Sequence, residues 1–281
     1  MSQSQFGFIK NKGTDNSFAK LRETVGGCTA KYQMGLFLDI SGAFDNAWPP
    51  KILEQLRIMD CPIDVYKLLK SYLTNRRVII ESQQTFILKK VMKGAPQGSV
   101  LGPTLWNIIF NDLIKRLEAA GFKVIAYADD LCIVIEGNNK RELKERAQLA
   151  CIIVQEWATE YKQAFSEEKT KLLFFKGSNQ LDLNYLNIYS DINNIQRPGG
   201  RGQGQGSGRA KSNKIEILNA HKYLGVTVDK SEGYHLHATE VAKKAVEVFT
   251  ILKQSCRRDW GITPSRLIII YKGLFLPTKT Y

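Results

Sequence analysis

The chain has 281 residues, with 40 Lys and Arg against 27 Asp and Glu and a formal net charge of +13. Hydrophobic residues make up 43% of it, which is enough for a packed core and excludes a largely disordered chain. The excess of positive charge predicts a polyanionic partner, nucleic acid first and an anionic membrane surface second.

Other features exclude several classes of protein. No apolar run reaches about 18 residues, so no transmembrane helix is expected, and the first ten residues lack the apolar stretch of a signal peptide. The five cysteines are scattered without a Cys-x-x-Cys pair, so neither a zinc site nor a disulfide framework is indicated. We expect an intracellular protein of the nucleus or the cytoplasm, not a secreted one.

The first predicted elements lead to a carboxylate. A basic loop over residues 5–15 precedes a helix near 16–25, and an apolar strand over 34–40 follows, with Asp39 near its end. A charge at the end of a buried strand must be paired, neutralised or metal-bound. The alternative is an aspartate that caps the next turn.

The middle of the chain alternates helices, strands and a loop. Helices are expected over 49–59 and 63–73, and two strands over 77–81 and 86–90. Basic residues cluster around those strands: Arg76, Arg77, Lys89, Lys90 and Lys93. The loop over 94–103 has three glycines and two prolines, so its backbone can approach a ligand closely.

Ser99 is expected to cap a helix that runs to about residue 120. That helix has an apolar face, made of Leu101, Leu105, Ile108, Ile109, Leu113 and Leu117. Two short apolar runs follow, over 122–126 and 131–135, and both are typical of strands.

The link between those runs contains Asp129 and Asp130, so we predict a β-hairpin with adjacent carboxylates at its tip. Adjacent like charges cost free energy unless a cation lies between them, and hard divalent cations prefer carboxylate oxygen. A solvated turn is the alternative, because Asp is common in turns.

The rest of the chain is predicted to contain an amphipathic helix over 140–161 and strands over 171–175, 215–218 and 223–228. Residues 193–213 are rich in Gly and Arg and predict a flexible surface insertion, with RNA contact as the alternative. Two helices complete the chain, over 237–253 and 264–275. The first should bury Val241, Ala245, Val248, Phe249 and Leu252.

If the strands pair, Asp39, Asp129 and Asp130 converge. Three carboxylates there could hold two metal ions about 3.5–4 Å apart, the arrangement used for in-line phosphoryl displacement. The basic surface would then bind nucleic acid backbones, mostly without base preference.

Several segments resemble the motifs of reverse transcriptases. Residues 37–45, 94–103 and 127–130 are similar, in order, to the palm motifs of that family. The sequences of the first two segments most resemble those of non-LTR (LINE-like) retrotransposons. Residues 166–171 resemble the motif after the palm helix, and 223–226 the primer-grip strand. The resemblance extends from residue 5 to about 228, and the final helices are similar to the start of the thumb.

The resemblance implies an α+β fold, a polymerase palm with an antiparallel sheet backed by helices. It implies partial fingers over 1–33, a palm over 34–230 with a fingers portion near 60–92, and the start of a thumb over 231–281. Upstream fingers strands and the rest of the thumb have no counterpart in the sequence. We therefore expect a fragment of a larger polyprotein.

The implied activity is RNA-directed DNA synthesis, with an RNA template, a DNA primer and dNTPs as partners and no membrane. The implied cofactor is two Mg²⁺ ions, with Mn²⁺ as a substitute. Asp39, Asp129 and Asp130 would be the catalytic metal ligands, assisted by the Ile40 carbonyl.

Further roles follow from the same resemblance. Phe44 would exclude a 2′-hydroxyl by its bulk and select dNTPs. Gln97 and Gly98 would line the incoming nucleotide and the template base. Lys169 would protonate the leaving pyrophosphate, or else be a solvated surface lysine. The predicted primer contacts are Tyr127, Tyr223, Leu224 and Gly225.

Other functions stay open at this point. One is a group II intron or retron-type reverse transcriptase. The LINE-like sequences of residues 42–45 and 94–99 argue against it. Another is a non-catalytic RNA-binding module that keeps the fold; loss of an aspartate would favour it, and all three are present. An RNA-dependent RNA polymerase would use the same metal-binding carboxylates. Phe44, at the position that would exclude a 2′-hydroxyl, disfavours it.

Overall fold

The computed structural model describes residues 1–82, 85–96, 98–166, 168–177, 215–230, 235–254 and 263–275. The chain divides between Ile217 and Leu218 into two compact units, which are described separately. None of the helices within these described ranges is both long and apolar enough to cross a membrane. The predicted insertion over 193–213 lies outside the described residues.

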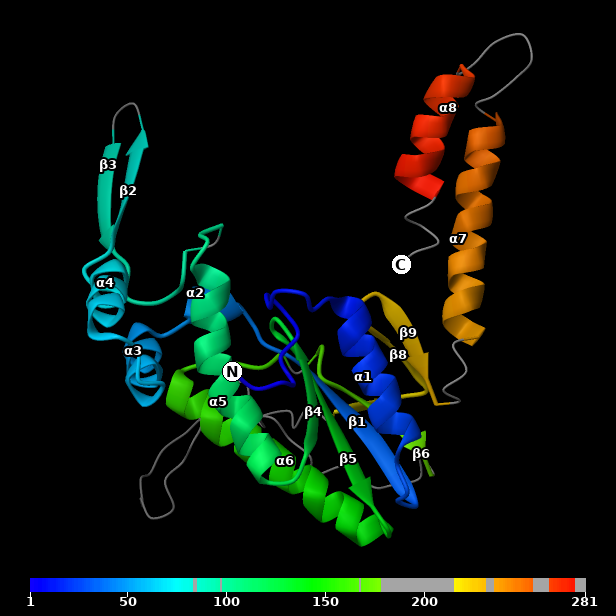
Figure 1. Ribbon diagram of the computed structural model, residues 1–281, viewed down its shortest axis with the longest axis horizontal. Coiled ribbons are helices and arrows are strands. Elements are labelled where there is room, and N and C mark those ends of the chain that lie inside the picture. Colours follow the sequence, from blue (N-terminus) through cyan, green and yellow to red (C-terminus); the bar gives the residue numbers. More distant parts are fainter. Residues whose placement is uncertain are drawn as a thin grey trace, which may run out of the picture. The chain divides into compact units, whose positions relative to one another are not determined.

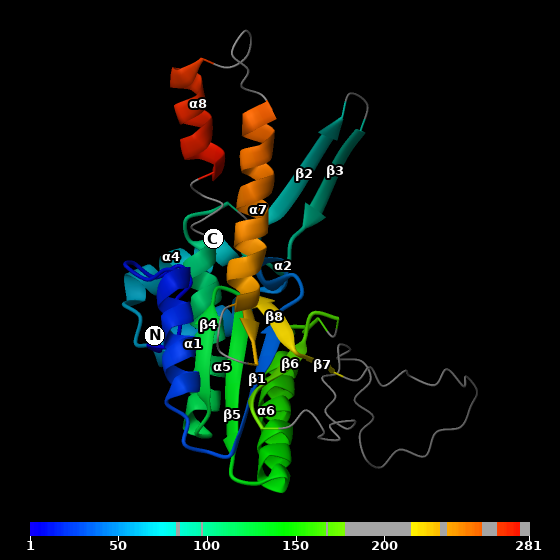
Figure 2. The same cartoon turned by 90° about the vertical axis from the view of Figure 1, so that its right-hand side faces the viewer.

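The first unit is built on an antiparallel sheet with the strand order β4-β5-β1-β6-β7 (Figures 1 and 2). Strand β1 is central and pairs with β5 on one side and β6 on the other, and β4 pairs with β5. Strand β7 extends one residue past the boundary between the units. The bounds are β1 (Tyr32–Asp39), β4 (Lys123–Tyr127), β5 (Asp130–Gly137), β6 (Lys171–Lys176) and β7 (Glu216–Leu218).

The described residues of this unit form six helices: α1 (Thr14–Gly26), α2 (Ala43–Asn46), α3 (Pro49–Ile58), α4 (Ile63–Leu73), α5 (Gly102–Ala119) and α6 (Lys140–Tyr161). Local chemistry explains several ends. The Asn139 side chain accepts a hydrogen bond from the Glu142 amide at the start of α6. The Ser99 hydroxyl accepts one from Gly102, the first residue of α5. The predicted bounds of α4 and α6 are confirmed.

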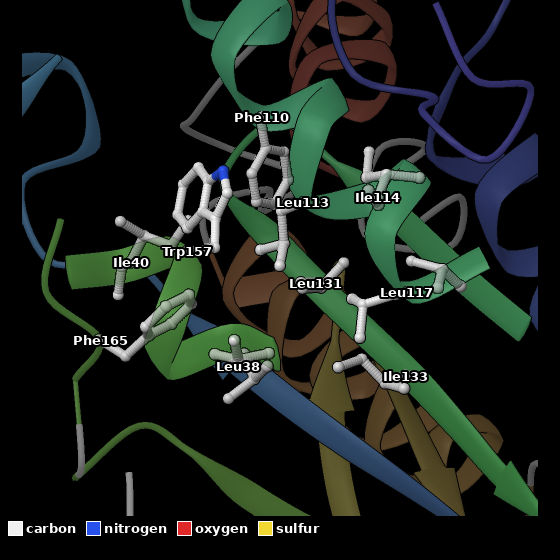
Figure 3. Packing of buried hydrophobic residues seen from close by; sticks show 14 of the residues in the cluster. Leu38, Ile40, Phe110, Leu113, Ile114, Leu117, Leu131, Ile133, Trp157 and Phe165 are labelled. Carbon is white, nitrogen blue, oxygen red and sulfur yellow. The ribbon is translucent and has the colours of Figure 1, made fainter. Parts of the chain in front are cut away.

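Helices α5 and α6 cover one face of the sheet. Alternate residues of β1 point toward them, so that Leu38 and Ile40 pack with Leu131 and Ile133 of β5 against the helices (Figure 3). Helix α1 lies against β4, and its Thr24 carbonyl accepts a hydrogen bond from Gln33 of β1. The predicted stripe of α6, from Leu143 to Tyr161, is buried throughout.

Strands β2 (Arg77–Ser82) and β3 (Thr85–Lys90) form a separate hairpin that follows α4 (Figures 1 and 2). Its apolar side chains are exposed on both faces, with exposed fractions between 45% and 63%: Val78, Ile79, Ile80, Phe86, Ile87 and Leu88. Each strand of this hairpin thus has a run of three apolar residues that no other described element buries.

The core position predicted for Leu101 is wrong. Leu101 is 38% exposed, because it precedes the first turn of α5 instead of lying on its core face. On α4, Val65 and Leu68 are exposed, and only Leu69 and Leu73 are buried, because no other element covers the outer side of that helix within the described unit.

The second unit contains a small hairpin and helices: β8 (Ala220–Tyr223), β9 (Val226–Asp229), α7 (His235–Gln254), α8 (Pro264–Ile270) and the π-helix η2 (Tyr271–Phe275). The single strand predicted over 223–228 is wrong. Leu224 and Gly225 both have positive φ, +48° and +86°, and form a two-residue turn between β8 and β9. Phe249 of α7, predicted to be inside, is 56% exposed.

Candidate active site

Asp39 and Asp130 are brought together by strand pairing. Asp39 is the last residue of β1 and Asp130 the first of β5, and the two are direct partners in the antiparallel register. Directly opposed residues project from the same face of a sheet. Because Asp39 is one position out of step with Leu38 and Ile40, this face is the one turned away from α5 and α6.

The third carboxylate lies in the turn that joins β4 to β5. Tyr127 pairs with Asp130, so Ala128 and Asp129 form the tip of the predicted hairpin. Ala128 has φ +57°, a left-handed conformation that is uncommon for a residue with a Cβ. The structure thus brings Asp39, Asp129 and Asp130 to the same end of the sheet, where β1 ends and β5 begins.

Burial and mutual repulsion raise the pKa values of two carboxyl groups in this cluster. Burial, together with the neighbouring charges of Asp129 and Asp39, raises the pKa of Asp130 to about 6. Burial also raises the pKa of Asp129, with the Asp39 charge acting in the same direction. Raised values mean that the site lacks positive charge for its carboxylates.

Lys169 supplies one cation to the cluster. Its Nζ donates to both carboxylate oxygens of Asp39, at 3.1 and 3.3 Å. The hydrogen bond and the charge of Asp39 raise the pKa of Lys169. The loop that carries the lysine is fixed to the same strand, because the Ser166 amide donates to the Asp39 carbonyl.

The donor set fits a hard divalent cation, since it consists of carboxylates that lack countercharge. Within the described ranges, however, no group of three ligating side chains is close enough to hold one ion. Mg²⁺ is usually bound by one or two carboxylates, with substrate phosphates and water completing its shell.

Phe44 lies on α2, five residues after Asp39. Its ring packs edge-on against Phe8, with the ring centroids 6.1 Å apart, and against Trp106 of α5, with the centroids 6.2 Å apart. Its carbonyl accepts a hydrogen bond from Ala95, which joins α2 to the glycine-rich loop. The Ile40 side chain packs in the core next to Trp157 and Phe165 (Figure 3).

The glycine-rich loop is described on both sides of Gln97, which itself lies outside the described residues. Gly98 is exposed and has φ +78°. Gly94 also has positive φ, and a Cβ there would lie 2.9 Å from the Asp45 carbonyl oxygen. This contact explains why the loop needs a glycine at its start.

A cavity of about 700 Å³ opens between this loop and the base of the β2–β3 hairpin. Its lining includes the cations Arg76, Arg77 and Lys93, together with Asp45. Arg76 donates to the carbonyls of Lys93 and Gly94 and so connects the hairpin base to the loop. The basic cluster predicted from the sequence thus lies partly around a cavity.

The predicted primer residues fall in both units. Tyr127 is half-buried at the end of β4, opposite Asp130. Tyr223, Leu224 and Gly225 belong to the second unit, where Tyr223 is buried at the end of β8 and the other two form the turn.

Sequence reasoning missed a group of buried polar residues next to the turn that carries Asp129. Gln5, Trp106 and Asn107 are at most 1% exposed and hydrogen-bond around the Ala128 turn. A signal was present, because Asn107 interrupts an apolar run on α5, and a polar residue in a core requires a partner.

Comparison with known proteins identifies the family. Residues 1–228 match the reverse transcriptase (RNA-dependent DNA polymerase) family. A putative 115 kDa protein in the type-1 retrotransposable element R1DM of Drosophila melanogaster is 29% identical over 97% of this chain and 24% of its own length. The RNA-directed DNA polymerase from the mobile element jockey of the same species is 25% identical over 99% of this chain and 28% of its own length.

A solved structure supports the fold. Apo telomerase from Candida tropicalis aligns with a TM-score of 0.51 at 12% identity, over 82% of this chain and 36% of that one. The chain spans about a quarter of the length of the two curated relatives. The predicted α+β polymerase palm, with its antiparallel sheet backed by helices, is confirmed. The chain belongs to the reverse transcriptase family, as a domain whose relatives are polymerases of non-LTR retrotransposons.

Proposed function

We propose that this chain carries the polymerase centre of a larger retrotransposon protein and adds dNTPs to a primer 3′-hydroxyl on an RNA template. The observation that carries the proposal is the pairing of Asp39 with Asp130, with Asp129 in the adjacent turn. Reverse transcriptases use divalent metal ions, and this cluster of undercompensated carboxylates suits them.

Two Mg²⁺ ions, or Mn²⁺ in their place, would supply the charge that activates the 3′-hydroxyl and neutralises the triphosphate. Asp39, Asp129 and Asp130 would hold them, with the Ile40 carbonyl as a further ligand. Strand pairing at this end of the sheet fixes the carboxylates in place before substrate binds, which limits reorganisation during the reaction.

Lys169 is proposed as the proton donor to the leaving pyrophosphate. In the structure its ammonium group already contacts Asp39, and its raised pKa keeps it protonated. The side chain is 67% exposed, so it can turn from Asp39 toward an incoming triphosphate.

Phe44 is proposed to select dNTPs. The rings of Phe8 and Trp106 pack against Phe44 and limit its movement, so a 2′-hydroxyl placed against Phe44 would clash with its ring. Gln97 and Gly98 would line the incoming nucleotide. The cavity with Arg76, Arg77 and Lys93 is suited to a phosphate backbone or a triphosphate. Tyr127 is proposed to lie near the primer end, with Tyr223, Leu224 and Gly225 as further contacts.

Primer extension tests the proposal. An RNA template annealed to a DNA primer, with dNTPs and Mg²⁺, should give Mg²⁺-dependent extension that Asp129→Asn reduces by at least about 10³-fold. The variant keeps the size of the side chain and removes its charge. If this chain and a longer retrotransposon protein that contains it both bind RNA and make no DNA, the polymerase proposal is wrong and a non-catalytic RNA-binding module is indicated.

A further inference from the structure

Three buried polar side chains surround the turn that carries Asp129. Trp106 and Asn107 lie on α5, and Gln5 lies in the N-terminal segment beside β4. Their exposed fractions are 0%, 1% and 0%. None of the three has a role among the site residues described above, and buried polar groups of this kind need a structural or functional reason.

The carbonyl of Ala128 is the point on which they converge. It accepts a hydrogen bond from Trp106 Nε1 at 3.0 Å and a longer one from Gln5 Nε2 at 3.5 Å. A peptide group is planar, so the position of this oxygen fixes the plane that ends at the Cα of Asp129. The two donors therefore set the direction in which the Asp129 side chain leaves the turn.

The donors are themselves held by a closed set of hydrogen bonds. Gln5 Nε2 donates to Asn107 Oδ1 at 3.1 Å, and Asn107 Nδ2 donates to the Gly7 carbonyl at 2.9 Å. The Gly7 amide donates to Gln5 Oε1 at 3.0 Å. Both side-chain amides thus use their donor and acceptor atoms, which gives each one a single orientation.

Backbone contact brings the same segment against the turn. The Phe6 amide donates to the Ala126 carbonyl, and the Ala126 amide donates to the Ser4 carbonyl. A Cβ on Gly7 would lie 2.0 Å from the Ala128 nitrogen. Only glycine permits this approach, which presses the segment against the left-handed Ala128.

We infer that Trp106, Asn107 and Gln5 are positioning residues that hold the Ala128–Asp129 peptide, and through it the metal-binding carboxylate, in its working orientation. The inference rests on the proposed function of Asp129. Without these hydrogen bonds the disfavoured conformation of Ala128 would relax, and Asp129 would sample positions away from Asp39 and Asp130.

A matched pair of tryptophan substitutions tests the inference. Trp106→Phe removes the N–H that binds the Ala128 carbonyl and keeps an aromatic ring between Phe44 and Phe110. Trp157→Phe makes the same chemical change at an equally buried position, where the structure shows no hydrogen-bond partner for Nε1 among the described residues. The two variants lose similar volume, and only the first loses the contact with the turn.

A second pair separates the amide network from general damage to α5. Asn107→Ala removes the bonds to Gln5 and Gly7. Asn111→Ala, one turn further along the same helix, removes a bond to the Ser2 amide and leaves the network around Ala128 intact. Both asparagines are buried, at 1% and 3% exposure.

The first readout is Mn²⁺ binding to the full chain, followed by electron paramagnetic resonance, with Asp129→Asn to identify the site. Trp106→Phe and Asn107→Ala should raise the half-saturating Mn²⁺ concentration about tenfold, as loss of groups that orient metal ligands does. Trp157→Phe and Asn111→Ala should stay within about twofold of the parent chain. A purely structural role would instead shift binding in step with melting temperature.

The second readout does not depend on metal or on polymerase activity. Hydrogen exchange of the peptide over residues 126–131 should accelerate about tenfold in Trp106→Phe and Asn107→Ala, and not in their controls. Equal exchange in each matched pair would overturn the inference. If exchange differs as expected while no variant binds Mn²⁺ at the aspartates, the positioning inference stands and the proposed function fails.

Discussion

Two hairpins of similar composition have opposite surroundings in this protein. The β4–β5 hairpin and the β2–β3 hairpin both contain short runs of Ile, Val and Leu, and both are antiparallel. Ile133 of β5 is fully buried, whereas Ile87 of β3 is 51% exposed. Apolar residues therefore indicate a strand in both places, but burial depends on whether helices and a neighbouring strand cover it.

The difference matches the tasks proposed for the two hairpins. The first pairs with β1 in the sheet and is covered by helices α5 and α6. It carries carboxylates whose positions must be precise. The second pairs only with itself in the described sheets and has cations along it, so it can adjust to a nucleic acid backbone. A lone two-stranded hairpin has little stability of its own.

The largest effect expected from this contrast concerns stability. Ile133→Ala should reduce the free energy of unfolding by about 2–5 kcal/mol, because it leaves a cavity in a packed core. The same substitution at Ile87 should cost less than about 0.5 kcal/mol, because that side chain already contacts water. Urea unfolding of both variants measures the two losses. Similar losses would mean that the β2–β3 hairpin is covered in solution.

The next effect concerns charge. Asp130 has a pKa of about 6 in the folded chain against 3.8 for the free carboxyl, so the native state binds more protons than the unfolded state between these values. Its contribution to stability is therefore present below about pH 4 and is lost as the pH rises to about 6. Asp130→Asn removes this loss.

At pH 7.5 and in EDTA, Asp130→Asn should be more stable than the parent chain by on the order of 1 kcal/mol after allowance for solvent screening, and at pH 4 the two should agree. The control is Glu81→Gln on β2, an exposed carboxylate whose removal should change stability by less than about 0.5 kcal/mol at either pH. Thermal unfolding across this pH range measures both. A parent chain that gains stability between pH 4 and 6 relative to Asp130→Asn would contradict the assignment.

Several parts of this site could be predicted from sequence because they follow from local patterns. A strand that ends on Asp39 and a hairpin with Asp129 and Asp130 at its tip need only the period-two rule and a turn. Whether the two strands pair stayed a condition at that stage, and the structure shows that they do, with Asp39 opposite Asp130. The length of α6 was predictable because its cap at Asn139 and its apolar stripe agree with each other.

Other parts depend on contacts between distant segments. Gln5 and Asn107 are 102 positions apart, and no local pattern indicates that they share a hydrogen bond. The turn at Leu224 and Gly225 was missed because leucine seldom adopts positive φ. Exposure of Ile87 could not be inferred either, since it depends on the absence of a covering element.

The smallest effect expected concerns nucleic acid binding by the exposed hairpin. Lys89→Gln on β3 should reduce the slope of log affinity against log salt by about 0.7–1 for an RNA–DNA template–primer, because one phosphate contact is lost. Lys123→Gln, at the start of β4, removes the same net charge. Its ammonium group is already paired with Glu136 at 2.8 Å, so the slope should not change. Filter binding between about 50 and 200 mM salt measures both slopes. Equal slopes would mean that total charge, and not the position of the β2–β3 hairpin, controls binding, and the contrast between the two hairpins would then be one of packing alone.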